Sequence, residues 1–152
     1  FRRVAVAAAI ATLLSSGFRA LLGPSLGVTT RVNYPFSEVA RELSSRDLEG
    51  AIILTHNAWF AGNLRIRLPS SEVHVPGFVV PDPPAGHPVI VVWDAVRSEG
   101  VPVELQEVLA SRFGLGLRGL EPEYVSLPYL FGAGREARVG YLRLSAGARP
   151  GA

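Results

Sequence analysis

The stretch from Thr55 to Gly77, THNAWFAGNLRIRLPSSEVHVPG, holds the densest group of side chains in the chain that could do chemistry. Its histidines, asparagines and arginines donate and accept hydrogen bonds, and an acidic residue ends a second apolar run, VIVVWD, further along. Polar side chains that follow strands are typical of ligand sites in α/β folds. The candidates for ligand binding are His56, Asn57, Asn63, Arg65 and Asp94.

The spacing of the polar residues forms no catalytic or metal-binding motif. The three histidines, His56, His74 and His87, are far apart, and no H-E-x-x-H sequence is present. The chain has no cysteine, which excludes thiolate ligands and cysteine nucleophiles, and no serine lies in G-x-S-x-G. We therefore predict no catalytic residue, no metal ligand and no cofactor in this chain.

One glycine-rich segment, Phe113 to Gly119, has the spacing of a dinucleotide-binding loop. Such a loop must open a helix, because the helix N-terminus meets the phosphates. This segment instead closes a predicted helix, where glycine is favoured as a cap with positive φ. A cytosolic nucleotide-binding enzyme is thus the weakest hypothesis, since it lacks a phosphate loop.

Hydrophobic periodicity and turn residues predict an alternation of helices and strands. The expected helices are 35–45, 57–68 and 103–113, and the expected strands are 51–55, 72–75, 89–93, 123–130 and 137–144. This order predicts an α/β fold: a small Rossmann-like three-layer domain with a mostly parallel sheet and a C-terminal antiparallel hairpin. His56, Asn57 and Asp94 then fall at the carboxyl ends of strands.

The stretch from Thr55 to Gly77 also has a purely structural interpretation, which is an alternative to ligand binding. Asn57 stands where a helix N-cap is expected, and its side chain can accept a hydrogen bond from the first turn. Trp59, Phe60, Leu64 and Ile66 would then pack the inner face of that helix. We favour this interpretation over ligand binding for most of the stretch.

The first residues, FRRVAVAAAIATLLSSGFRALLG, are the most apolar part of the chain. Three interpretations stay open: a transmembrane helix with the two leading arginines on the cytoplasmic side, a segment like a signal peptide, and an amphipathic or buried helix. We expect a hydrophobic, membrane-spanning helix at 1–24, a connector at 25–34, a soluble α/β domain at 35–146 and a flexible tail at 147–152.

The charges indicate no nucleic-acid partner. All 15 basic residues are arginine, the formal net charge is only +2, and no run of arginines exceeds two. Nucleic-acid binding needs a basic stripe or patch, because phosphate contacts dominate its affinity. We therefore expect no nucleic acid among the partners.

Several short segments together resemble the C-terminal extramembrane region of bacterial membrane glycosyltransferases of family 39, which are related to the dolichyl-phosphate-mannose–protein mannosyltransferases. The similar features are PFSEVARELSSRD, AIILTHNAWFAGNLRIRLP, EVHV, VIVVWDA and the closing YVSLPYLFGAGREARVGYLRL. They cover roughly residues 30 to 145 and form a pattern rather than one diagnostic motif.

The resemblance implies a polytopic membrane enzyme that transfers a sugar from a polyprenyl-phosphate donor, in the bacterial inner membrane. It places the α/β domain on the periplasmic side. The family's acidic catalytic residues, with any associated divalent metal, lie in an early extramembrane loop that has no counterpart here. The resemblance therefore implies a non-catalytic domain or fragment, and a stand-alone exported α/β ligand-binding module is the alternative.

Overall fold

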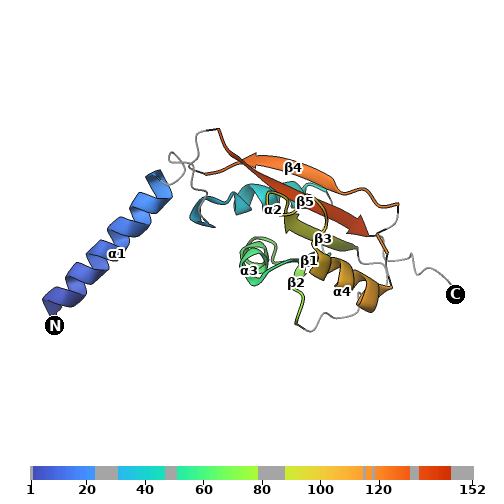
Figure 1. Ribbon diagram of the computed structural model, residues 1–152, viewed down its shortest axis with the longest axis horizontal. Coiled ribbons are helices and arrows are strands. Elements are labelled where there is room, and N and C mark those ends of the chain that lie inside the picture. Colours follow the sequence, from blue (N-terminus) through green and yellow to red (C-terminus); the bar gives the residue numbers. More distant parts are fainter. Residues whose placement is uncertain are drawn as a thin grey trace. The chain divides into compact units, whose positions relative to one another are not determined.

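The computed structural model describes most of the chain, and it divides into two compact units (Figure 1). The units are Phe1–Pro35 with Pro128–Ala137, and Phe36–Leu127 with Arg138–Ala152. The described residues are 2–22, 31–46, 51–78, 88–114, 116–117, 119–130 and 134–144. The expected tail at 147–152, most of the connector at 25–34, and His87 lie outside them.

The described residues form four α-helices, one short 3-10 helix and a five-stranded sheet. The helices are α1 (Arg2–Leu22), η1 (Arg31–Asn33), α2 (Phe36–Ser44), α3 (Ala58–Arg67) and α4 (Val103–Phe113). The strands are β1 (Ile52–Thr55), β2 (Glu72–His74), β3 (Val89–Asp94), β4 (Glu123–Pro128) and β5 (Glu136–Leu144). The expected α/β class and order of elements from residue 35 onward are confirmed.

The sheet is mixed, with strand order β2-β1-β3-β5-β4. β1 pairs in parallel with β2 and with β3, whereas β3 pairs antiparallel with β5. β4 lies beside β5 in the sheet, and the two strands run in opposite directions in Figure 1, which confirms the expected hairpin. A parallel half joined to an antiparallel half is therefore the architecture that positions the candidate site.

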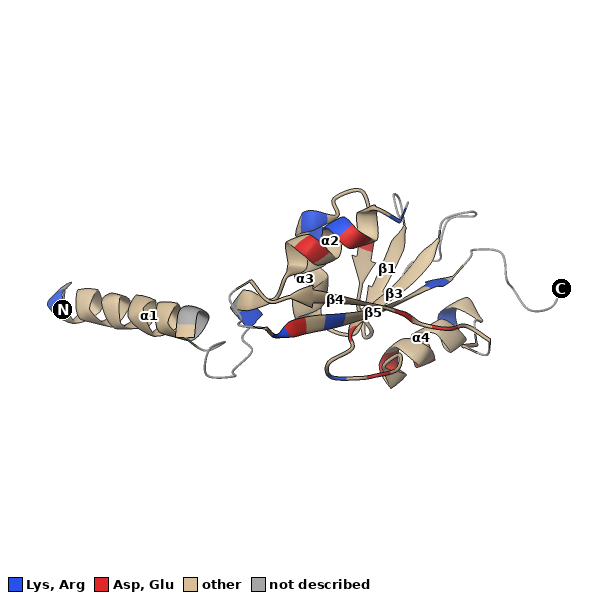
Figure 2. Cartoon of the chain, turned by 90° about the horizontal axis from the view of Figure 1, so that it is seen from above, with Lys and Arg blue, Asp and Glu red and all other residues tan. Residues whose placement is uncertain are grey.

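Helices cover both faces of this sheet. Figure 2 shows α2 and α3 on one side of the strands and α4 on the other. The face under α4 holds an apolar core in which every residue is buried. Its residues are Ile52, Leu54, Val89, Val91, Trp93, Ala95, Val101, Leu105, Leu109, Leu142 and Leu144. The opposite face packs against the buried side chains Phe36, Val39, Ala40, Leu43, Phe60 and Leu64 of α2 and α3.

One glycine is required by the packing of the α4 face. Gly140 pairs with Trp93 across β5 and β3, and Trp93 is fully buried. A Cβ atom at Gly140 would lie 2.4 Å from two carbon atoms of the indole ring. The indole Nε1 donates to the carbonyl oxygen of Ser98 at 3.0 Å, which satisfies the polar group of the buried ring.

A charged network closes the other face near the end of α2. Arg46 contacts Glu42 at 2.9 Å and Glu123 at 2.8 Å, and its guanidinium lies 4.6 Å from the centre of the Tyr141 ring. The Tyr141 hydroxyl donates to the Glu123 carboxylate. Burial, followed by this hydrogen bond, raises the pKa of Tyr141 to about 12. These contacts link the end of α2 to the hairpin formed by β4 and β5.

The structure corrects one packing expectation for α3. Ile66 was expected on the inner face, but its side chain is 78% exposed. It lies two residues after the buried Leu64, which turns it about 200° around the helix axis and so to the opposite side. Phe60 and Leu64, four residues apart, are buried as expected, and Trp59 is half-buried.

The first unit contains α1, η1 and the turn of the hairpin. Tyr34 and Tyr129 meet edge to face with ring centres 5.9 Å apart, and Leu130 donates its amide to the carbonyl oxygen of Asn33 at 3.0 Å. α1 confirms the expected N-terminal helix. Within the described part of the chain, however, no helix combines the length and apolarity that crossing a membrane requires, so the expected span at 1–24 is not confirmed.

Candidate functional site

The connections that follow β1 and β3 run to opposite sides of this parallel strand pair, and the candidate site lies at this point. From β1 the chain passes through α3 to β2, on one side of β1. From β3 it passes through α4, on the other face, to the hairpin on the far side of β3. The two connections thus diverge from neighbouring parallel strands, and in open α/β sheets ligands bind outside the carboxyl ends of such strands.

His56 is the first residue after β1 and is half-buried. Its ring lies 5.4 Å from the ring of Phe60, and its Nδ1 atom is buried without a hydrogen-bond partner among the described residues. Burial lowers the pKa of the imidazole, while the carboxylates of Asp94 and Glu104 oppose the shift. The side chain is therefore held in its neutral form at neutral pH.

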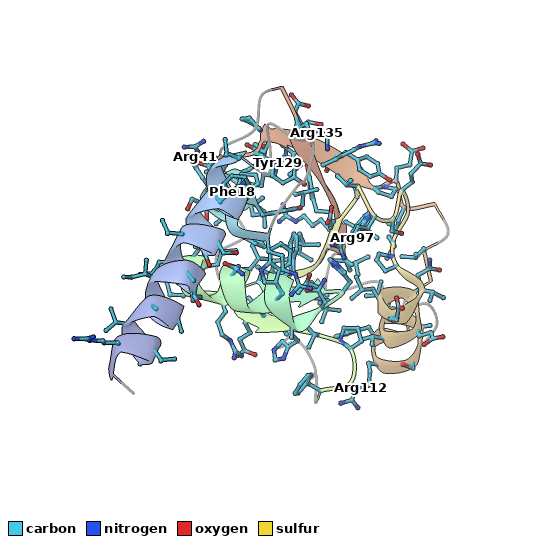
Figure 3. The ribbon with its side chains drawn as sticks, turned by 60° about the vertical axis from the view of Figure 1, so that its left-hand side comes forward. Phe18, Arg41, Arg97, Arg112, Tyr129 and Arg135 are labelled. Atoms are coloured by element: carbon cyan, nitrogen blue, oxygen red, sulfur yellow. The ribbon has the colours of Figure 1, made fainter. Side chains whose placement is uncertain are left out.

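Asp94 ends β3 and is only 7% exposed. Its Oδ1 accepts a hydrogen bond from the amide of Val96 at 3.2 Å, and its Oδ2 lies 3.5 Å from Nε of Arg97. Burial raises the pKa of this carboxyl, and the Val96 amide, Arg97 and His56 counteract the shift. Figure 3 shows Arg97 on the segment that leaves β3.

Thr55 is a member of this group that the sequence analysis did not single out. It pairs with Val92 in the parallel register, and because side chains alternate along a strand, Thr55 and Asp94 share one face of the sheet. Thr55 is fully buried, and its Oγ1 has no hydrogen-bond partner in the described part of the chain. The available signal was one hydroxyl at the end of an otherwise apolar strand, IILT.

Arg97 is the second residue that the sequence analysis missed. Its distance of three residues from Asp94 across a turn was the available signal, since that spacing allows an ion pair. Its side chain is 70% exposed, so the guanidinium is open to solvent while it contacts the buried carboxyl of Asp94. Asp94 thus has an exposed ion-pair partner.

The other three predicted residues separate from this group or have structural roles. Asn57 caps α3, and its side chain accepts from the amide of Phe60 at 2.9 Å, as the structural interpretation predicted. Asn63 donates to the carbonyl oxygen of Trp59 at 2.9 Å, and it lies about 9 Å further along the helix than Asn57. Arg65 is exposed and has no ion pair or hydrogen bond among the residues that the structure describes.

The group formed by Thr55, His56, Asp94 and Arg97, called here the switch-point group, offers hydrogen bonding rather than a metal site. It combines a hydroxyl, a neutral imidazole, a buried carboxyl and a guanidinium. Across the described residues, no three His, Cys, Asp or Glu side chains are placed to hold a metal ion. The arrangement can orient a polar ligand through donors and acceptors placed side by side.

Comparison with known proteins gives one informative similarity. The chain is 30% identical over 151 residues to the lipopolysaccharide core galacturonosyltransferase RgtA of Rhizobium johnstonii. That relative is a glycosyltransferase. The similarity covers 93% of this chain but only 30% of the relative, so the chain spans less than a third of that protein's length. No family profile matches the chain, and no solved structure matches it, so the Rossmann-like relationship stays a prediction.

Proposed function

We propose that this chain forms the C-terminal, non-catalytic domain of a polytopic membrane glycosyltransferase that uses a polyprenyl-phosphate sugar donor. The similarity to the galacturonosyltransferase supports this proposal most strongly, because it extends over 93% of the chain. The chain spans about 30% of that relative's length, so the remaining length can hold a membrane region and a catalytic loop. Both the donor and the C-terminal position rest on the family resemblance.

The exposed side chains of α1 are consistent with attachment to a membrane region. Val4, Leu13, Leu14 and Phe18 are between 58% and 73% exposed, and alanines fill much of the remaining surface. A helix that is apolar on most sides requires an apolar environment, which lipid or other membrane helices provide. In the proposed enzyme, α1 joins the membrane region, and the α/β domain lies on the periplasmic side of the inner membrane.

The test uses the complete protein encoded by the gene that contains this sequence. Membranes that hold this protein should transfer sugar from a polyprenyl-phosphate sugar to a lipid-linked acceptor, detected as a mass increase of one sugar residue. The 152-residue chain alone should transfer none, because it lacks the catalytic loop. Transfer by the isolated chain, or transfer only from nucleotide sugars, would overturn the proposal.

A stand-alone exported ligand-binding module is the second candidate, and the switch-point group favours it. Under this alternative the chain reaches the periplasm as a separate product and binds its ligand without a membrane region. Immunoblotting of cell fractions from the native host discriminates the two. A product of about 16.2 kDa in the periplasm supports the module, whereas a larger membrane-bound product supports the transferase.

A further inference from the structure

The switch-point group contains two buried polar atoms whose hydrogen bonds no protein group satisfies. They are Oγ1 of Thr55 and Nδ1 of His56, and neither has a partner among the described residues. A buried polar atom without a partner destabilises a fold, so natural proteins contain few of them. Two such atoms on consecutive residues, at the carboxyl end of a central strand, indicate that this place is adapted to something other than stability.

The remaining atoms of the group show what a ligand must supply. Among the described residues, Asp94 Oδ2 has only the 3.5 Å contact with Arg97, which is too long for a good hydrogen bond, so it can accept another. The less buried nitrogen of His56, Nε2, carries the proton if Nδ1 keeps its lone pair, and it can then donate. Arg97 is largely exposed and also donates. A suitable ligand therefore both donates and accepts hydrogen bonds within a small area.

The charges of the group exclude two classes of ligand. An anion would meet the buried carboxyl of Asp94, and a cation would meet the guanidinium of Arg97. Neighbouring hydroxyl groups avoid both conflicts, because each hydroxyl has one donor and two acceptor positions. A neutral sugar ring carries such hydroxyl groups on adjacent carbon atoms.

We propose that the carboxyl ends of β1 and β3 bind a neutral saccharide, whose hydroxyl groups donate to Asp94, Thr55 and Nδ1 of His56 and accept from Nε2 of His56 and from Arg97. This inference rests on the proposed function and deepens it, since the bound saccharide is the sugar part of the acceptor in the transfer. The domain thereby orients the acceptor and takes no part in the chemistry of transfer.

Binding is measured by NMR on the isotope-labelled 152-residue chain, titrated with methyl hexopyranosides of the gluco, galacto and manno series. At least one of them should shift the backbone signals of residues 55–57 and 94–97 in a saturable way. Inorganic phosphate is titrated in parallel. Saturable shifts with phosphate alone would make this an anion site and overturn the proposal, and so would the absence of saturable shifts with any saccharide.

Two variants distinguish a binding role from a structural one. Thr55→Val replaces the hydroxyl with a methyl group of similar size, so it should raise the midpoint of thermal unfolding while it weakens saccharide binding. A lower midpoint for this variant would show that Oγ1 stabilises the fold, and it would contradict the proposal. Arg97→Ala should weaken binding by at least about tenfold without unfolding the domain, because its side chain is exposed.

Arg65→Ala is the matched control, since Arg65 is also an exposed arginine but lies away from the switch-point group. It should leave the dissociation constant for the saccharide unchanged, and an equal loss of affinity in both arginine variants would indicate nonspecific electrostatic binding.

Experiments on the complete protein distinguish the failure of this inference from the failure of the proposed function. Sugar transfer without saccharide binding at residues 55–57 overturns this inference alone, whereas saccharide binding without transfer overturns only the proposed function.

Discussion

The α4 face of the sheet and the carboxyl ends of β1 and β3 differ in whether their buried polar atoms have hydrogen-bond partners. In the apolar core under α4 every residue is apolar and buried, and the one polar atom of the Trp93 ring has a hydrogen-bond partner. At the carboxyl ends, Thr55 and His56 bury polar atoms that have no partner in the described part of the chain, and Asp94 buries a carboxyl. The first region stabilises the fold, whereas the unsatisfied polar atoms of the second region lower its stability.

The contrast shows where this fold can tolerate change. Apolar packing is cooperative and dense, so a lost or added carbon atom on the α4 face changes the free energy of unfolding directly. At the carboxyl ends, replacing an unsatisfied polar group with an apolar one of equal size should instead increase stability. Stability measurements on a few substitutions therefore test whether the two regions differ as described.

The largest expected effect comes from truncating a core side chain on the α4 face. Leu109→Ala should lower the free energy of unfolding by about 2–5 kcal/mol, because it removes a fully buried side chain and leaves a cavity. Urea denaturation followed by circular dichroism measures it. The control, Val103→Ala, alters an exposed residue of the same helix and should change stability by no more than about 0.5 kcal/mol.

A smaller loss is expected from Gly140→Ala, which tests overpacking in the same region. The new methyl group would lie 2.4 Å from the indole of Trp93, so the ring or the strand must move, at about 1–3 kcal/mol. Gly62→Ala in α3 meets no atom within 4 Å and should stabilise the helix by about 0.5–1 kcal/mol. Equal effects of the two substitutions in urea denaturation would contradict the described packing.

Next in size is the helix cap beside the switch-point group. Asn57→Ala should cost about 0.5–2 kcal/mol, because the amide of Phe60 loses its side-chain partner. Asn57→Asp keeps an acceptor oxygen and should retain most of the stability. Thermal unfolding compares the two variants, and an equally large loss in both would show that Asn57 acts through something other than capping.

The smallest expected effect is a pH dependence that comes from His56. Burial lowers its pKa below the ordinary value of 6.5, so the unfolded chain binds the proton more readily than the folded chain. Stability should therefore fall as pH falls from about 6.5 through the folded pKa, with a slope of at most about 1.4 kcal/mol per pH unit. His56→Gln should flatten this slope, and urea denaturation at several pH values would show an unchanged slope if the assignment is wrong.

Asp94 should act in the opposite direction at lower pH. Its folded pKa is raised above the ordinary value of 3.8, so the folded chain holds the proton more tightly than the unfolded chain. The stability associated with the protonated carboxyl is lost as pH rises through the folded pKa. Asp94→Asn should remove this loss, and the same series of measurements, extended into the acidic range, checks it.

The sequence predicted the elements of the α/β domain because their signals are local. VIVVW is short, continuously apolar and rich in β-branched residues, which favours a buried strand, and the helix from Val103 to Phe113 has its apolar residues at helical spacing. The cap at Asn57 and the positive φ of 63° at Gly114 follow from short-range preferences. The exposed Ile66 shows the limit, since residue type alone does not fix the buried side of a helix.

Only part of the candidate site could be predicted, because its other members depend on strand register. His56 and Asp94 follow from their positions after apolar strands. Thr55 shares a face with Asp94 only because β1 pairs with β3 with Thr55 opposite Val92, and no local pattern encodes that register. Arg97 matters only because Asp94 is buried, and that burial depends on β5, the antiparallel neighbour of β3.

The two tryptophans of the chain are placed so that each reports on one of the two regions. Trp93 is fully enclosed in the apolar core, whereas Trp59 is half-buried in the first turn of α3, three residues after His56. Their fluorescence should therefore separate into a blue-shifted, quencher-protected component from Trp93 and a red-shifted, quenchable one from Trp59. With Trp59→Phe as reference, the protein's own emission can follow events at the carboxyl ends of the strands independently of the core.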